Sequence, residues 1–144
     1  MEAKVGRNIG YITRFSLLTV ILGVAVGAMS PSLSQAQTAF VLGGGLAEEC
    51  FLGVKRNAPT RATRAICDRA LETEALSQHD LAATLVNRGI TALRSKDANS
   101  ALTDFNAALR QDPAISAAFL NRAGAYLLLG RWLDAKVDAD TAIA

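Results

Sequence analysis

The sequence has few of the residues that most often carry chemistry. Its only histidine is His79, its cysteines number two, and its charged residues leave a net charge of +2. A lone histidine with no cluster of further ligands argues against a metal site. The three glycines at 43–45 lack the lysine and hydroxyl residue that follow a phosphate-binding loop. We therefore expect no metal, no cofactor and no catalytic residue.

One long hydrophobic run is present, and it lies near the N-terminus. Residues 15–29 carry no charge, which is the length of a signal-peptide core and short for a membrane span. A basic leader precedes the run, formed by Lys4, Arg7 and Arg14. The small residues Ser34 and Ala36 follow it. We predict that residues 1–36 are a signal peptide cleaved after Ala36, with an uncleaved inner-membrane anchor as the alternative.

Removing this leader changes the charge balance of the remaining chain. Three of the fifteen basic residues and one of the thirteen acidic residues lie within residues 1–36. The remainder is therefore close to neutral, and its basic residues are interspersed with acidic ones. This removes the usual electrostatic basis for binding nucleic acid.

The remaining candidates for catalysis are weak. Ser77, His79 and Asp80 include the atoms of a hydrolase triad, but such close neighbours cannot form an oriented nucleophile–base–carboxylate chain. Asp104 and Asp138 recur at one fixed offset, so we expect them to lie on a helix surface. Trp132 falls at a predicted hairpin turn, where we expect it to pack against its own repeat.

The two cysteines, Cys50 and Cys67, both lie beyond the leader. An even pair in an exported chain predicts a disulfide, and two buried free thiols are the alternative. Closing a loop of this length would stabilise the fold by roughly 3 kcal/mol.

Apolar residues recur at spacings of three and four from residue 47 onward, and no stretch alternates as a strand. We predict an all-α protein in which residues 37–45 form a flexible lead-in. The helices are expected at 46–56, 60–76, 80–95, 98–110, 114–129 and 132–143. They group into three hairpins, at 46–76, 80–113 and 114–144.

Local signals mark the predicted helix ends. Pro59 is expected in the first turn of its helix, Ser77 and Asp80 form a capping box, and Asp97 is a further cap. Asp112 with Pro113 is expected to start the fifth helix, and Gly130 to end it.

Residues 82–110 and 116–144 align at an offset of 34 residues. The identical pairs are Ala83/Ala117, Asn87/Asn121, Arg88/Arg122, Leu93/Leu127, Ala101/Ala135, Asp104/Asp138 and Ala108/Ala142. A fixed offset of this length indicates an array of helix pairs, which commonly provides a curved binding surface.

These residues resemble the tetratricopeptide repeat (TPR) family, an α-solenoid of tandem antiparallel hairpins. The first repeat supplies Leu85, Gly89, Ala101, Phe105, Ala108 and Pro113, and the second supplies Phe119, Ala123, Tyr126, Ala135 and Ala142. The departures are Ala92 and Ala139, in places where the family has aromatic residues, and Arg88 and Arg122, in places where it has leucine. The resemblance covers residues 80–144 well, and residues 46–76 as a degenerate hairpin.

The resemblance implies that the first helix of each hairpin lines a concave face that binds a protein or peptide. The residues expected to contact this partner are Val86, Asn87, Ile90, Leu93, Leu120, Asn121 and Leu127. The asparagine amides would hold a peptide backbone. The alternative is that these residues pack on a neighbouring helix or on a second copy of the chain.

We therefore expect a non-catalytic TPR scaffold exported to the bacterial periplasm or secreted. A membrane-anchored scaffold and a self-assembling structural unit are the alternatives.

Overall fold

The computed structural model describes residues 37–58 and 60–144, which contain six helices and no strand. The helices are α1 (Leu46–Lys55), α2 (Thr60–Thr73), α3 (Gln78–Arg94), α4 (Ala98–Gln111), α5 (Ser116–Leu128) and α6 (Trp132–Ile143). The all-α prediction is confirmed, and each helix begins and ends within three residues of its predicted limits. The predicted signal peptide and Pro59 lie outside the described residues.

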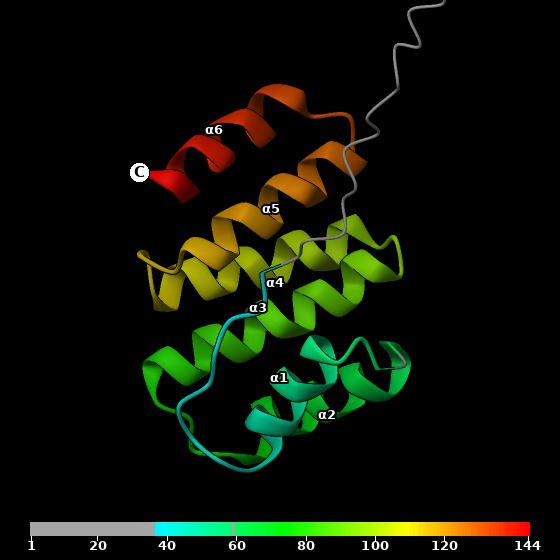
Figure 1. The fold of residues 1–144 in the computed structure, drawn as a ribbon, viewed down its shortest axis with the longest axis vertical. Helices are drawn as coiled ribbons and strands as arrows, with labels where there is room; N and C mark the ends of the chain where they lie inside the picture. Colours follow the sequence, from blue (N-terminus) through cyan, green and yellow to red (C-terminus); the bar gives the residue numbers. More distant parts are fainter. Residues whose placement is uncertain (1–36, 59) are drawn as a thin grey trace, which may run out of the picture. The chain divides into compact units, whose positions relative to one another are not determined.

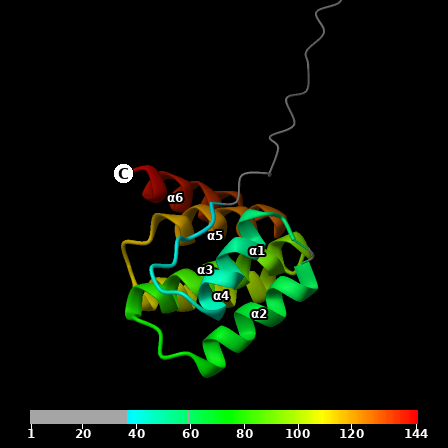
Figure 2. The ribbon, with the colours of Figure 1, turned by 60° about the horizontal axis from the view of Figure 1, so that its bottom comes forward.

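The helices pack as sequential pairs, α1 with α2, α3 with α4, and α5 with α6. Neighbouring pairs contact through α2 and α3 and through α4 and α5, so the pairs follow one another in chain order (Figure 1). The first helices of the pairs also touch, α1 against α3 and α3 against α5. Residues 37–45, cyan in Figures 1 and 2, run as an extended trace beside these first helices.

Most of the predicted helix-end signals act as expected. The Ser77 hydroxyl accepts a hydrogen bond from the Asp80 amide at 3.1 Å and donates to the Asp80 carboxylate at 2.8 Å. Asp97 accepts from the amide of Ser100 at 3.0 Å. Gly130 has a φ of 71°, the left-handed conformation that favours glycine after a helix.

The predicted start of the fifth helix is wrong. The Asp112 carboxylate accepts from the amide of Ala114 at 3.0 Å, which closes a turn instead of starting a helix. The helix α5 begins only at Ser116, and no side chain caps it. An aspartate that bonds its own chain two residues on favours a turn over a helix start.

The N-terminus of α1 is capped by a residue from the end of α2. The Glu74 carboxylate accepts from the amides of Leu46 at 2.6 Å and Ala47 at 3.0 Å. A carboxylate is favoured there, because the first amides of a helix have no partner within it. Gly45, with φ at 85°, leaves room for the carboxylate, because a side chain at this position would meet Glu74.

Cys50 of α1 and Cys67 of α2 lie at disulfide distance, with their Cα atoms 4.9 Å apart. Both are completely buried. The predicted pairing is confirmed, and it joins the two helices of the first pair.

Each of the two later helix pairs contains an ion pair between a partly exposed arginine and a buried aspartate. Arg88 of α3 binds both oxygens of Asp104 in α4, at 3.0 and 2.6 Å, and also reaches Asp68 at 3.0 Å. Thirty-four residues later, Arg122 makes the same two contacts with Asp138, both at 2.7 Å. The hydrogen bonds that each guanidinium donates to its aspartate raise the pKa of that guanidinium above its ordinary value.

The expectation that both aspartates lie on a helix surface is wrong. Asp104 is 3 % exposed and Asp138 4 % exposed. Their recurrence therefore reflects a structural contact between the two helices of a pair, because a buried carboxylate requires a charged partner.

The small residue at position 89 allows α3 and α4 to approach. A Cβ atom added to Gly89 would lie 2.5 Å from Cε1 of Phe105, a fully buried ring. A Cβ atom added to Gly124, on α5, would meet only Cδ1 of Leu93, at 3.8 Å. The two glycines occupy helix interiors with opposite packing demands.

We expect Gly89→Ala to lower the free energy of unfolding by about 1–2 kcal/mol. Overpacking a core costs roughly 1–3 kcal/mol, and the higher helix propensity of alanine returns at most about 1 kcal/mol. Gly124→Ala is the matched control, and we expect it to be neutral or stabilising by up to about 1 kcal/mol. Urea unfolding measures both variants, and equal effects would contradict this packing argument.

Candidate functional site

An open groove of about 920 Å³ is lined by residues of α1, α3, α5 and α6. Its apolar lining comes mainly from α3 and α5 and includes Ile90, Leu93, Leu120, Gly124 and Leu127. The C-terminal end of α1 forms one wall, through Val54 and Lys55. We call this surface the groove.

Five of the seven residues predicted to bind a partner lie in the groove. They are Ile90, Leu93, Leu120, Asn121 and Leu127. The other two, Val86 and Asn87, are completely buried and do not line it.

Asn87 is covered by the chain's own N-terminal part. Its side-chain amide donates to the carbonyl of Ala39 at 2.8 Å, and its side-chain oxygen accepts from the amide of Ala39 at 3.2 Å. Both bonds are buried, and 48 residues separate the partners. One asparagine thus satisfies both polar groups of a backbone residue.

Asn121, thirty-four residues later, makes a related contact. Its amide nitrogen donates to the carbonyl of Gln37 at 2.8 Å and to that of Ala117 at 2.7 Å. Asp80, at the start of α3, makes a third contact: its carboxylate accepts a hydrogen bond from the Leu42 amide at 2.7 Å. Polar side chains at three points therefore hold the backbone of residues 37–42, which we call the docked segment.

The carboxylate of Asp80 is stabilised in its charged form. Burial raises its pKa, but hydrogen bonds from the Leu42 amide, the Ser77 hydroxyl and the Gly43 amide, with the nearby charge of His79, hold the pKa below its ordinary value. The bond to the docked segment thus favours the ionised acid at neutral pH.

Side chains of the docked segment alternate between core and solvent. Ala39 and Val41 are 5 % and 3 % exposed, whereas Phe40 and Leu42 are 59 % and 73 % exposed. Residues 37–45 are predicted to be a flexible lead-in, but in the structure residues 37–42 are held on α3 and α5. The alternation of small and large apolar residues over 39–42 is the one sequence signal for this contact. It is too short, and too close to three glycines, to predict that the segment is bound.

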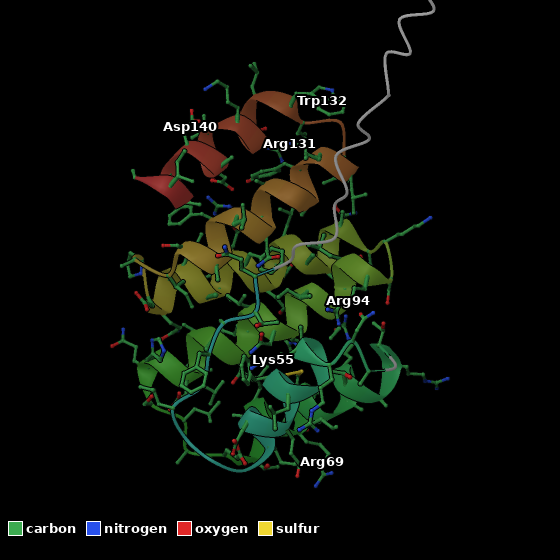
Figure 3. The ribbon with its side chains drawn as sticks, in the orientation of Figure 1. Lys55, Arg69, Arg94, Arg131, Trp132 and Asp140 are labelled. Atoms are coloured by element: carbon green, nitrogen blue, oxygen red, sulfur yellow. A yellow bond between two sulfur atoms is a disulfide. The ribbon has the colours of Figure 1, made fainter. Side chains whose placement is uncertain are left out.

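Three basic side chains lie at the rim of the groove, a feature that the sequence analysis missed. Lys55, Arg94 and Lys96 are exposed and line it, and Figure 3 labels the first two. Within residues 37–58 and 60–144, no carboxylate lies within ion-pair distance of these three. They come from the ends of α1 and α3, which only the fold brings together.

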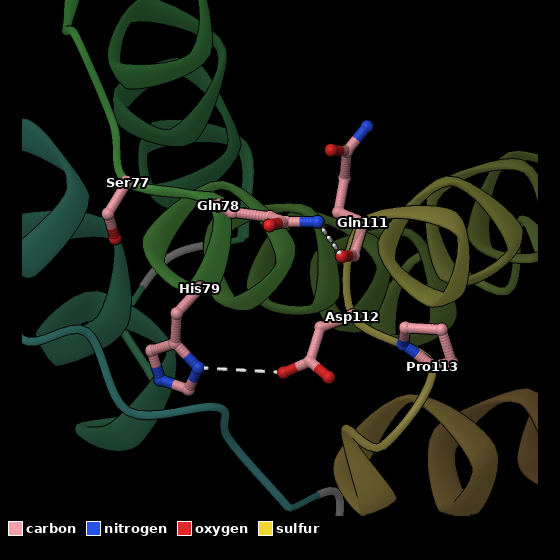
Figure 4. A pocket seen from close by; sticks show the side chains of 6 residues that line it. All are labelled: Ser77, Gln78, His79, Gln111, Asp112 and Pro113. Carbon is pink, nitrogen blue, oxygen red and sulfur yellow. Dashed lines mark hydrogen bonds and ion pairs between the residues drawn. The ribbon is translucent and has the colours of Figure 1, made fainter.

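A second, more polar pocket lies between the start of α3 and the turn that joins α4 to α5 (Figure 4). Here His79 Nδ1 lies 3.6 Å from Asp112 Oδ2, while the Ser77 hydroxyl is engaged with Asp80. Among the described residues, Ser77 has no hydrogen bond to His79, so the triad atoms are not arranged as a triad. In the described part of the chain, no three or more His, Cys, Asp or Glu side chains are grouped so that they could hold a metal ion.

The helix α6 exposes four large apolar side chains beside the exposed Lys136–Asp140 ion pair. Trp132, Leu133, Val137 and Ile143 are 68 %, 82 %, 63 % and 84 % exposed. The expectation that Trp132 packs against its own repeat is wrong, since its side chain is mostly exposed at the start of α6 (Figure 3). Arg131, beside it, stacks instead on the Tyr126 ring, 4.4 Å from its centroid.

In the part of the chain that the structure describes, no helix is long and apolar enough to cross a membrane. A scan against protein-family models finds no family that matches this chain, and a search of curated proteins also finds no match.

Proposed function

We propose that this chain is a TPR-like, non-catalytic interaction protein whose groove binds an extended segment of another protein. One observation carries the proposal: Asn87 and Asn121, one repeat apart, each hydrogen-bond the backbone of an extended segment. A surface that holds backbone groups in this way is suited to peptide recognition, because backbone bonds provide affinity while side-chain pockets select the sequence.

The unfilled part of the groove supports the same proposal. Its lining is apolar along α3 and α5. Thr38 is the residue of the docked segment that lines it, and the rest of the groove has room for further side chains. The basic rim formed by Lys55, Arg94 and Lys96 would favour acidic residues flanking the apolar ones of a partner.

We further propose that the chain works outside the cytoplasm, in the bacterial periplasm or as a secreted protein. The Cys50–Cys67 pair is consistent with an oxidising compartment, and the N-terminal apolar run is the length of a signal peptide. Retention of that run as an inner-membrane anchor is the alternative.

Crosslinking and affinity capture from native cells tests the proposed function. The groove variant carries Leu120→Asp and Leu127→Asp, and the matched control carries Leu133→Asp and Val137→Asp on α6. We expect a partner to be recovered with wild type and the control, and to fall at least tenfold with the groove variant. Circular dichroism checks that both variants fold, and equal recovery with all three proteins would overturn the proposal.

Self-assembly through α6 is a second candidate function, favoured by the apolar residues exposed on that helix. Sedimentation of the purified protein tests it. An oligomer that the α6 variant abolishes and the groove variant keeps would support assembly, and a monomeric wild type at high concentration would exclude it.

A further inference from the structure

We propose that the docked segment, residues 37–42, is an internal ligand of the surface formed by α3 and α5, which the groove continues, and that external ligands belong to its chemical class. That class is an extended peptide with small or β-branched apolar side chains at alternate positions. The inference rests on the proposed function and adds two things to it, the kind of peptide bound and a competitor within the chain.

The contacts to the docked segment use mainly its backbone. Asn87 binds the amide and carbonyl of Ala39, Asn121 binds the carbonyl of Gln37, and Asp80 binds the amide of Leu42. None of these bonds depends on the side chain of the bound residue. Any extended peptide that reaches the same positions can form them.

Selectivity then comes from the two side chains that point inward. Ala39 and Val41 belong to the same buried apolar cluster as Val86 and Ile90. A polar or charged residue at either position would be buried without a partner, which is costly. Phe40 and Leu42 are mostly exposed, so their positions tolerate substitution.

The docked segment is also connected in a way that allows it to leave. The exposed glycines 43–45 join it to α1, and it contributes no helix to the fold. Because Glu74 caps α1 independently, α1 does not need the segment to begin. Attachment through a short linker gives the segment a high effective concentration, so it competes with an external peptide.

The open part of the groove explains how an external peptide could prevail. It begins beside Thr38 and continues along Leu93, Leu120 and Leu127. A longer peptide can bind the asparagines and fill this region as well, which the docked segment does not do.

The test measures binding of a fluorescent peptide with the sequence of residues 37–44, acetylated and amidated, to the full chain. Val41→Asn should release the docked segment, whereas Leu42→Asn, one position away, places the same residue where the side chain is exposed. When a competitor occupies a site, the apparent affinity for another ligand is the intrinsic affinity multiplied by the fraction of sites that are free. We expect the peptide to bind Val41→Asn at least tenfold more tightly than wild type, and Leu42→Asn within twofold of wild type.

A second peptide, with asparagine in place of the residues equivalent to Ala39 and Val41, should not bind any of the three proteins. Equal binding of the first peptide to wild type and to folded Val41→Asn, or no binding to either, would overturn the inference. Hydrogen exchange of the wild type covers the case in which Val41→Asn does not fold. The Ala39 and Leu42 amides should exchange faster than those of α3, and exchange only at the rate of global unfolding would also overturn it.

This test can fail separately from the proposed function. A cellular partner lost with the groove variant, combined with no binding of the peptide, would overturn the internal-ligand inference alone. Peptide binding to Val41→Asn, combined with partner recovery that ignores the groove variant, would overturn the proposed function alone.

Discussion

Asp104→Ala is expected to lower the free energy of unfolding by about 3 kcal/mol, because it leaves Arg88 without its main partner inside the fold. Removing one member of a buried ion pair typically costs 3–5 kcal/mol. We expect the lower end, because the Arg88 side chain is 25 % exposed and retains Asp68 at 3.0 Å. Urea unfolding measures the change.

Asp134→Ala is the matched control for this prediction. Asp134 also pairs with an arginine, Arg131, at 2.7 Å, but both side chains are about half exposed. Water screens such a pair, so its loss should cost under about 1 kcal/mol. Equal losses for Asp104→Ala and Asp134→Ala would show that burial does not determine the strength of these pairs.

A combined Arg88→Met and Asp104→Leu variant separates the value of the pair from the cost of an orphaned charge. Apolar residues of similar size often replace a buried ion pair at little cost. We therefore expect the double variant to be more stable than Asp104→Ala. If it is less stable, the pair itself contributes most of the stabilisation.

Removing the disulfide by Cys50→Ser with Cys67→Ser is expected to lower the free energy of unfolding by about 3 kcal/mol. The bond joins α1 to α2 across a short loop, and it restricts the unfolded chain. Both residues are buried, so the serine hydroxyls also lose contact with water. Chemical unfolding with and without reductant measures the effect.

The reductant provides the control. It should destabilise the wild type by a similar amount and leave the double serine variant unchanged. A wild type that is insensitive to complete reduction would contradict the expected contribution. Because α1 supplies Val54 and Lys55 to the wall of the groove, reduction should also weaken ligand binding there.

The helices and their ends were largely predictable, because their causes lie within a few residues. The pairs Ser77 with Asp80 and Asp97 with Ser100 form the expected caps, and Gly130 has the expected positive φ. The Asp112–Pro113 start failed because an aspartate can equally close a turn, and the competing conformations differ by little energy.

The candidate site was only partly predictable. The family resemblance led to the prediction of Ile90, Leu93, Leu120, Asn121 and Leu127 as binding residues, and these five line one groove. It also identified Asn87, but not that Ala39 covers it. The recurrence of Asp104 at the 34-residue offset led to the prediction that it lies on a helix surface. That prediction failed because a fixed offset does not show whether a side chain faces the solvent or the core.

The sequence by itself determined the all-α class, the approximate positions of six helices and the 34-residue offset, and it left each cysteine one possible disulfide partner. Each depends on local periodicity, on short-range caps or on a choice with one possible partner. Only the tertiary structure decided that Glu74 caps α1, that Arg88 pairs with the buried Asp104, and that residues 37–42 occupy the surface beside Asn87 and Asn121. These contacts join residues 16 to 84 positions apart, and no pattern within a single helix specifies which distant side chain will complete them.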